Sequence, residues 1–195
     1  MRTFIAVNLP DEIKKNVAEA TAGLKKIDSG VKWVEPENLH LTLKFLGWVE
    51  DRRLPEVVEI AGKVGAPSFK LKLAGVGSFP EGKSPRVLWV DIIEGAAELK
   101  PLADRLEKDY SSAGFRAEER EFSPHLTIGR IKDKGGIDQV IEEMQKLAGV
   151  SFGECVIDSL EIMKSTLSPK GPTYEVYKSF RFGKSPSTGS GQGGK

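Results

Sequence analysis

The stretch Leu39–Gly47 has the sequence LHLTLKFLG and contains a His-x-Thr motif flanked by apolar residues. An apolar run of this length predicts a buried strand. Because side chains alternate between the two faces of a strand, His40 and Thr42 share a face, and Lys44 continues that row. The opposite face is expected to pack in a core and carries Leu41, Leu43 and Phe45. Such a strand has the pattern expected beside a polar cleft.

A second copy of the motif follows at Pro124–Arg130, with the sequence PHLTIGR. Here His125 and Thr127 share a face, and the chain contains two histidines in all, one in each copy. A single histidine on a strand is usually a structural or surface residue, and a threonine there usually serves through its β-branched shape. Two copies with the same spacing, which together hold both histidines, favour one shared functional site.

The composition of the 195-residue chain is that of an ordinary globular protein, with 39% hydrophobic and 29% charged residues. The net charge of +1 argues against a broad basic surface for long nucleic acid, although a small phosphate-bearing end still fits. The single cysteine, Cys155, excludes an internal disulfide and a cysteine-based zinc site. We expect no metal and no cofactor.

The amino-terminal run MRTFIAVNLP is too short for a signal peptide or a membrane span. We therefore expect a cytoplasmic protein without a membrane segment. Residues 1–184 are expected to form one domain of two interleaved lobes. The last residues, 185–195, are almost free of apolar side chains and are expected to form a disordered tail.

The apolar patterns predict an alternation of strands and helices. Strands are expected at 3–9, 31–34, 39–47, 69–79, 87–93, 124–130, 152–165 and 174–182, with a further extended segment at 115–121. Helices are expected at 11–27, 53–64, 96–113 and 137–147.

This order of elements repeats along the chain. The segment that begins at Phe4 resembles the one that begins at Val87, and the pair Ser68-Phe69 resembles the pair Ser151-Phe152 at the same offset in sequence. The offset between the two histidines is almost the same. We infer two similar lobes related by an approximate two-fold axis, with the two His-x-Thr strands facing one another across one cleft.

Two imidazoles at one point suit in-line displacement at phosphorus. One neutral histidine takes a proton from water, and the other, protonated, gives a proton to the leaving oxygen, because the reference pKa of histidine is about 6.5. The threonine hydroxyls can donate to the phosphate oxygens. Lys44 and Arg130 are the nearest cations, but strict alternation places Arg130 opposite His125. A bulge or strand end at Gly129 is required to re-aim it.

Five segments of the sequence resemble one known family. These segments are RTFIAVNLP, VKWVEPENLHLTLKFLG, FPEGKSPRVLWV, SPHLTIGR and STLSPKGPTYEVY, in this order, and the likeness covers residues 1–182. Together they resemble the RNA 2′,3′-cyclic phosphodiesterases of the two-histidine (2H) phosphoesterase superfamily, formerly called 2′-5′ RNA ligases.

This resemblance implies an α+β fold of two lobes with pseudo-two-fold symmetry. Each lobe is expected to be an antiparallel sheet with helices on its outer side, and the active-site cleft to lie between the lobes. The implied reaction is the hydrolysis of an RNA terminal 2′,3′-cyclic phosphate to a 2′-phosphomonoester. RNA 3′ ends or nucleoside 2′,3′-cyclic phosphates are the implied substrates, and a monomer is expected.

The residues that match the family's functional positions are those of the two motifs. The resemblance implies that His40 is the acid at O3′, that His125 is the base on water, and that Thr42 and Thr127 bind the phosphate. By the same resemblance Arg130 contacts the phosphate and Phe4 packs against the nucleoside.

Two other functions are compatible with the motifs. One is a 2′-5′ RNA ligase, the reverse of the same chemistry, although the chain has no phosphate-binding G-x-x-x-x-G-K-[ST] loop. The other is a module that binds RNA ends without turnover. Binding alone does not require two proton-transfer groups, so two histidines favour the enzyme.

Overall fold

The structure is a computed structural model that describes residues 1–80, 84–169 and 171–183. Its strands are β1 (Arg2–Asn8), β2 (Val31–Trp33), β3 (His40–Trp48), β4 (Phe69–Phe79), β5 (Val87–Glu94), β6 (Leu126–Ile131), β7 (Ser151–Ile157), β8 (Ser159–Ser168) and β9 (Gly171–Arg181). Its α-helices are α1 (Asp11–Thr21), α2 (Leu54–Gly62), α3 (Ala96–Ser112) and α4 (Ile137–Gln145). Short 3₁₀ turns are η1 (Leu24–Lys26), η2 (Pro36–Asn38) and η3 (Asp51–Arg53). The expected tail, 185–195, lies outside the described residues.

The described strands form two antiparallel sheets, one of four strands in the order β3-β1-β8-β9 and one of five in the order β2-β6-β5-β4-β7. The halves of the sequence are interleaved, because β2 and β4 precede the midpoint of the chain but pair within the five-stranded sheet. The expected repeat is visible in the pairing. In one sheet β1 lies between β3 and β8, and in the other β5 lies between β6 and β4.

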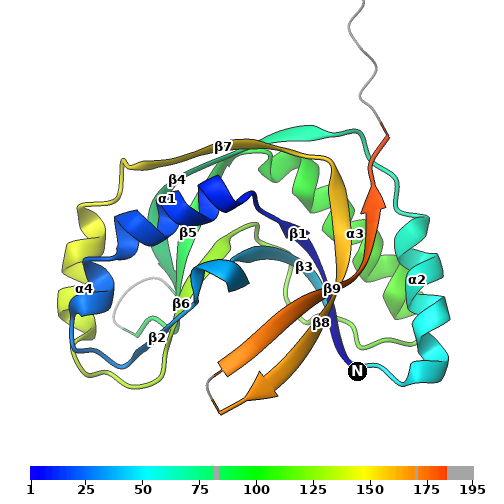
Figure 1. Ribbon diagram of the computed structural model, residues 1–195, viewed down its shortest axis with the longest axis horizontal. Helices are drawn as coiled ribbons and strands as arrows, with labels where there is room; N and C mark the ends of the chain where they lie inside the picture. Colours follow the sequence, from blue (N-terminus) through cyan, green and yellow to red (C-terminus); the bar gives the residue numbers. More distant parts are fainter. Residues whose placement is uncertain (81–83, 170, 184–195) are drawn as a thin grey trace, which may run out of the picture.

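Helices pack on both sheets. Helix α3 contacts β3 and α2 contacts β9, whereas α1 contacts β7 and α4 contacts β4. In Figure 1 the two sheets form an arch, with α2 and α3 on one side, α1 and α4 on the other, and the β8–β9 hairpin projecting at the bottom. The expected two-lobed α+β fold is confirmed.

The helices form where the apolar spacing predicts them, and α3 illustrates why. Its buried residues recur every three or four positions, which places them on one stripe of the helix: Leu99, Leu102, Ala103, Leu106 and Tyr110. Gly95 precedes the helix with a φ of 94°, a left-handed conformation that glycine adopts without a steric penalty. Within the described residues, no helix has the length and apolarity needed to cross a bilayer.

Two predicted segments differ from the structure. Residues 115–121, expected to be extended, form no strand, because this highly charged stretch lacks the apolar face that a sheet would bury. The strand expected at 152–165 is two strands, β7 and β8, which are separated at Asp158 and belong to different sheets. By its pairing, β8 rather than β7 holds the place equivalent to β4, so the offset between Ser68 and Ser151 does not mark equivalent strands.

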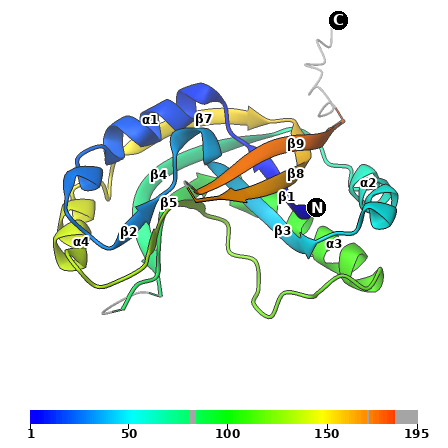
Figure 2. The same cartoon turned by 60° about the horizontal axis from the view of Figure 1, so that its bottom comes forward.

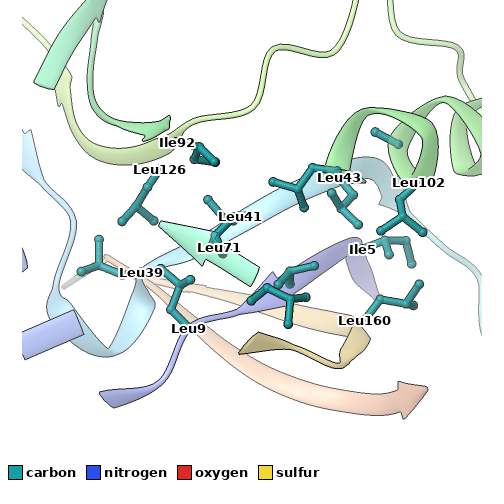
Figure 3. Close-up of a cluster of buried hydrophobic side chains, with 14 of the residues drawn as sticks. Ile5, Leu9, Leu39, Leu41, Leu43, Leu71, Ile92, Leu102, Leu126 and Leu160 are labelled. Atoms are coloured by element: carbon teal, nitrogen blue, oxygen red, sulfur yellow. The ribbon is translucent and has the colours of Figure 1, made fainter. Parts of the chain in front are cut away.

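One hydrophobic core extends through both lobes. It joins Leu41 and Leu43 of β3 to Ile5 of β1, and it includes Leu71 and Leu126 of the other sheet. Figure 3 shows these side chains between the strands. The apolar face of the first motif strand therefore packs as its sequence predicts, which leaves the opposite face for His40.

Candidate active site

A β-bulge follows the threonine of the first motif. Ala6 of β1 pairs with Thr42, but the next residue, Ile5, pairs with Lys44, so that Leu43 is an extra residue in β3. A bulge of this kind reverses the alternation of side chains beyond it. Lys44 is accordingly 1% exposed on the core side, whereas Phe45 is 51% exposed. The prediction that Lys44 shares the face of His40 is wrong, and so is the prediction that Phe45 lies in the core.

The second motif contains the same irregularity at the equivalent place. Trp89 of β5 pairs with Thr127, and Leu88 pairs with Gly129, which leaves Ile128 as the extra residue. The bulge brings the exposed Arg130 to the face of Thr127. This is the re-aiming that a contact between Arg130 and the phosphate was predicted to need. Phe45 and Arg130 are thus equivalent positions, each five residues after its histidine and each re-aimed by a bulge.

The two histidines are held in the same way. His40 Nδ1 lies 2.6 Å from the carbonyl oxygen of Asn38, and His125 Nδ1 lies 2.7 Å from that of Ser123. A carbonyl oxygen only accepts hydrogen bonds, so Nδ1 carries the proton in both rings. In the neutral ring Nε2 is then the basic nitrogen.

The threonine of the first motif contacts its histidine directly. Thr42 Oγ1 lies 3.0 Å from His40 Nε2, and its hydroxyl donates to this nitrogen while the ring is neutral. In the part of the chain that the structure describes, His125 Nε2 has no such partner. The site is therefore not symmetric in its resting hydrogen bonds, although its backbone is nearly so.

Aromatic rings surround His40. The ring of Phe4 lies 4.8 Å and that of Tyr174 5.0 Å from the imidazole, centroid to centroid, and Phe45 lies 6.0 Å from Phe4. Phe4 itself is only 3% exposed, because these neighbours cover it. Its predicted contact with a nucleoside stays a prediction, and the more exposed rings beside it are Tyr174 and Phe45.

His125 has a different neighbourhood. Phe79, at the end of β4, meets the imidazole edge-on at 5.2 Å, and Phe79 in turn lies 5.0 Å from Trp89. The Trp89 ring lies over Gly77, where an added Cβ would come within 2.3 Å of it. Glycine at this position is what allows the ring to lie flat beside the second motif.

The electrostatics of the two histidines are linked through Arg130. Burial, with a smaller effect of the charges of Lys14 and Arg130, lowers the pKa of His40 to about 4, against the opposing effect of the hydrogen bond that Nδ1–H donates to the Asn38 carbonyl. Burial also lowers the pKa of His125, with Arg130 again adding to the effect. The charge of the guanidinium therefore acts on both rings, and the lowered pKa of each ring favours the neutral imidazole in the free protein.

The strands that carry the motifs meet, since β3 and β6 are in contact although they belong to different sheets. The site thus holds two imidazoles and one arginine whose charge acts on both rings, and among the described residues no carboxylate forms an ion pair with that arginine. Such an arrangement can bind an anion and move two protons around it. Among the described residues, no three histidine, cysteine, aspartate or glutamate side chains gather as metal ligands.

A comparison with protein families agrees with this duplicated site. One family model, described as LigT-like phosphoesterase, matches the chain twice, at residues 7–89 and 90–174. The chain belongs to the LigT-like phosphoesterase family. Each match contains one His-x-Thr motif, so the family's repeat coincides with the repeat in the fold.

Relatives of this LigT-like phosphoesterase carry a more specific name. A protein of Archaeoglobus fulgidus named RNA 2′,3′-cyclic phosphodiesterase is 39% identical over 180 residues, which cover 92% of this chain and 99% of the relative. One of Thermotoga maritima with the same name is 39% identical over 189 residues, covering 93% and 96%. Among solved structures, TT0787 of Thermus thermophilus has a TM-score of 0.78 at 29% identity, covering 93% of this chain and 98% of that one. E. coli LigT complexed with 3′-AMP shares the fold, with a TM-score of 0.76 at 24% identity over 93% of this chain and 97% of that one.

Some residues of the site in this LigT-like phosphoesterase were not identified from the sequence. The carbonyls of Asn38 and Ser123 orient the histidines, and any residue type supplies a carbonyl, so composition gives no signal. Tyr174 is far from His40 in the sequence and reaches it only because β9 pairs with β8 beside β1. The repeat itself was a usable signal, since Asn38 and Ser123 each precede their histidine by two positions.

Proposed function

We propose that the chain hydrolyses the terminal 2′,3′-cyclic phosphate of RNA to a 2′-phosphomonoester without a metal ion, with His40 and His125 as the acid–base pair. The observation that carries this proposal is the matched pair of imidazoles, each with Nδ1–H bound to a carbonyl, beside one arginine. The names of the relatives support the choice of substrate.

The reaction needs two proton transfers. Water attacks phosphorus while the Nε2 atom of one histidine takes its proton. The bond from phosphorus to O3′ breaks, its electron pair stays on O3′, and Nε2–H of the other histidine protonates that oxygen. One water is consumed, the 2′-phosphate and a free 3′-hydroxyl form, and the histidines exchange their protonation states until solvent resets them.

The phosphate is bound by the remaining polar groups of the site. Arg130 presents a planar fork of donors that suits two phosphate oxygens at once. The hydroxyls of Thr42 and Thr127 donate to the same oxygens as negative charge grows during the attack. For this the Thr42 hydroxyl leaves His40 Nε2, which frees that nitrogen to hold a proton.

Because the pKa of His40 is low, this residue must gain a proton before it can act as the acid. At neutral pH Nε2 of His40 carries no proton in the free protein, because burial and nearby cations disfavour the imidazolium form. A bound phosphodiester is an anion that offsets the Arg130 charge and favours imidazolium. Substrate binding therefore brings the proton to His40, and His125 stays neutral as the base.

Phosphorus NMR tests the reaction most directly. Cytidine 2′,3′-cyclic phosphate is incubated with the protein in the presence of a strong chelator, and the product is identified as the 2′- or the 3′-phosphate. We expect the 2′-phosphate at an unchanged rate. Loss of activity that a divalent cation restores contradicts the metal-free reaction. A 3′-phosphate reverses the orientation of the substrate and the roles of the two histidines.

A further inference from the structure

The face of the four-stranded sheet that carries His40 continues well beyond the histidine. On β1 the side chains of Arg2, Phe4 and Ala6 share this face, because they alternate with the core residues Ile5 and Val7. Directly opposite residues of paired strands lie on the same face. The cross-strand partners therefore extend it, as Phe4 pairs with Phe45 and Arg2 pairs with Trp48. This surface, formed by Arg2, Phe4, His40, Phe45, Trp48 and Tyr174, is here called the histidine face.

Large aromatic side chains are unusually exposed on the histidine face. Phe45 is 51% exposed and Trp48 is 79% exposed. The helices do not cover them, because α2 and α3 pack on the opposite face of this sheet, where the core residues lie. A small second hydrophobic cluster of Phe4, Ala6 and Met163 packs against Tyr174, and the ring of Phe4 lies 6.0 Å from that of Phe45.

Arg2 adds a free positive charge to this surface. Within residues 1–80, 84–169 and 171–183, no carboxylate forms an ion pair with it. Burial raises the pKa of Tyr174, and the charges of Arg130 and Arg2 act on it in the opposite direction. The ring centroid of Tyr174 lies 5.0 Å from that of His40, so both charges act on the ring that packs on the first histidine.

We propose that the histidine face binds single-stranded RNA upstream of the cyclic end, with Trp48 stacking a base and Arg2 contacting a phosphate of the preceding nucleotides. This rests on the proposed function and names its substrate class: oligoribonucleotides rather than free nucleosides. Alternating aromatic rings and unpaired cations in line with a phosphate site are the features by which proteins bind single strands without reading sequence.

The distance between neighbouring rows of side chains on the histidine face fits the distance between neighbouring nucleotides of single-stranded RNA. From Phe4 to Arg2 the chain advances two residues, about 7 Å along β1. The pairs Phe4–Phe45 and Arg2–Trp48 are therefore successive rows on the histidine face. Both rows lie on the same face of the sheet as His40. The terminal nucleoside occupies the row of Phe4 and Phe45, and the nucleotide before it occupies the row of Trp48 and Arg2, which Tyr174 continues across the sheet.

The test compares two substrates with one cyclic end: cytidine 2′,3′-cyclic phosphate, and a short single-stranded oligoribonucleotide that ends in it. For Trp48→Ala we expect the ratio of kcat/KM between oligonucleotide and nucleotide to fall about 5- to 150-fold, the range typical for loss of one base–aromatic stack. Trp48→Phe should retain most of the ratio. Val156→Ala, at another exposed apolar residue, on the edge strand β7 of the other sheet, should leave it unchanged.

The contribution of Arg2 is measured from the dependence of kcat/KM on salt concentration. Arg2→Ala should reduce the slope of log(kcat/KM) against log salt concentration for the oligonucleotide by about 0.7, the value for one phosphate contact on a single strand. Lys15→Ala removes one exposed charge from α1 and should not change that slope. Binding of a fluorescent oligoribonucleotide gives the same comparison without turnover.

The outcomes separate the two proposals. If the wild type does not hydrolyse cytidine 2′,3′-cyclic phosphate, the proposed function fails, and the binding measurement still decides the role of the histidine face. If Trp48→Ala changes both substrates equally, or neither, the RNA surface is wrong. A Trp48→Ala variant that instead alters the oligomeric state, at unchanged substrate ratio, shows a protein interface and also overturns it.

Discussion

Lys44 Nζ lies 2.7 Å from Glu107 Oε2 and joins the first motif strand to helix α3. The same ammonium donates to the carbonyl of Arg116 at 2.7 Å, in the segment that leads from α3 to His125. Figure 2 shows this segment running from the side of the molecule that holds α2 and α3 toward β6. Glu107 also accepts a hydrogen bond from the backbone of Glu118. Lys44, which is buried in the first motif strand, thus binds both helix α3 and the segment that leads to His125.

We expect Glu107→Gln to destabilise the fold. Lys44 is 1% exposed, so the change leaves a buried charge without its counter-ion. Removing one partner of a buried pair typically costs about 3–5 kcal/mol, and the partial exposure of Glu107 places this pair near the lower end. Urea unfolding measures the loss. Lys63→Met, at an exposed pair with Glu59, is the control and should cost less than about 1 kcal/mol. Equal losses would show that the Lys44 pair is not a buried anchor.

We expect His40→Ala and His125→Ala each to lower kcat about 100- to 10,000-fold, because each ring handles a different proton. The double variant should be little worse than either single one, since the two groups act in one step. Circular dichroism should remain that of the wild type, because neither ring belongs to the main core. A single variant that keeps a tenth of the activity would remove that residue from the proton transfers.

The strands, the helices and the duplication of the His-x-Thr motif follow from periodicity and repetition, which are properties of the sequence itself. The bulges do not. Strict alternation from His40 leads to Lys44, and only the pairing of Ile5 with Lys44 shows that Leu43 is inserted. The burial of Lys44 depends on Glu107, a residue distant in sequence, so local pattern cannot reveal it. The division at Asp158 is likewise decided by which sheet offers an edge to β8.

Stability should depend on pH through His40. Its pKa is about 4 in the folded chain, whereas an unfolded histidine has a pKa of about 6.5. Between these values the unfolded state binds more protons, so the free energy of unfolding falls as the pH falls. One pKa unit corresponds to about 1.4 kcal/mol, so the full loss from His40 is about 3 kcal/mol. His40→Gln should lose correspondingly less between pH 7 and 4.5 in urea unfolding. Parallel curves for the two proteins would contradict the low pKa.

Binding of an anion should reverse this shift. With inorganic phosphate beside Arg130, the pKa of His40 should rise, because the added negative charge favours imidazolium. NMR titration of the two histidines, with and without phosphate, measures the change, and the His40→Gln spectrum assigns the signals. If the pKa of His125 rises instead, His125 is the acid and His40 the base.

Arg130 and Phe45 provide the clearest test of the asymmetry between the two halves. Both follow their histidine by five residues and both are turned outward by a bulge, but only one is a cation. Arg130→Ala should weaken inhibition by inorganic phosphate and lower kcat/KM. Loss of a hydrogen bond to a charged group is worth about 1.5–3 kcal/mol, or about 10- to 150-fold. Arg130→Lys should recover part of this, since an ammonium restores the charge but not the planar fork.

Phe45, the position equivalent to Arg130 in the first motif, can then be used to test whether the location of the guanidinium matters. Phe45→Arg in the Arg130→Ala background returns a guanidinium to the matching place on the other sheet. Because the two bulges re-aim these positions in the same way, we expect phosphate inhibition to recover above that of Arg130→Ala alone. The product of cytidine 2′,3′-cyclic phosphate should shift toward the 3′-phosphate, since the anchor now lies on the opposite side of phosphorus. Recovery of phosphate inhibition with the 2′-phosphate still formed would show that the nucleoside, and not the arginine, orients the substrate.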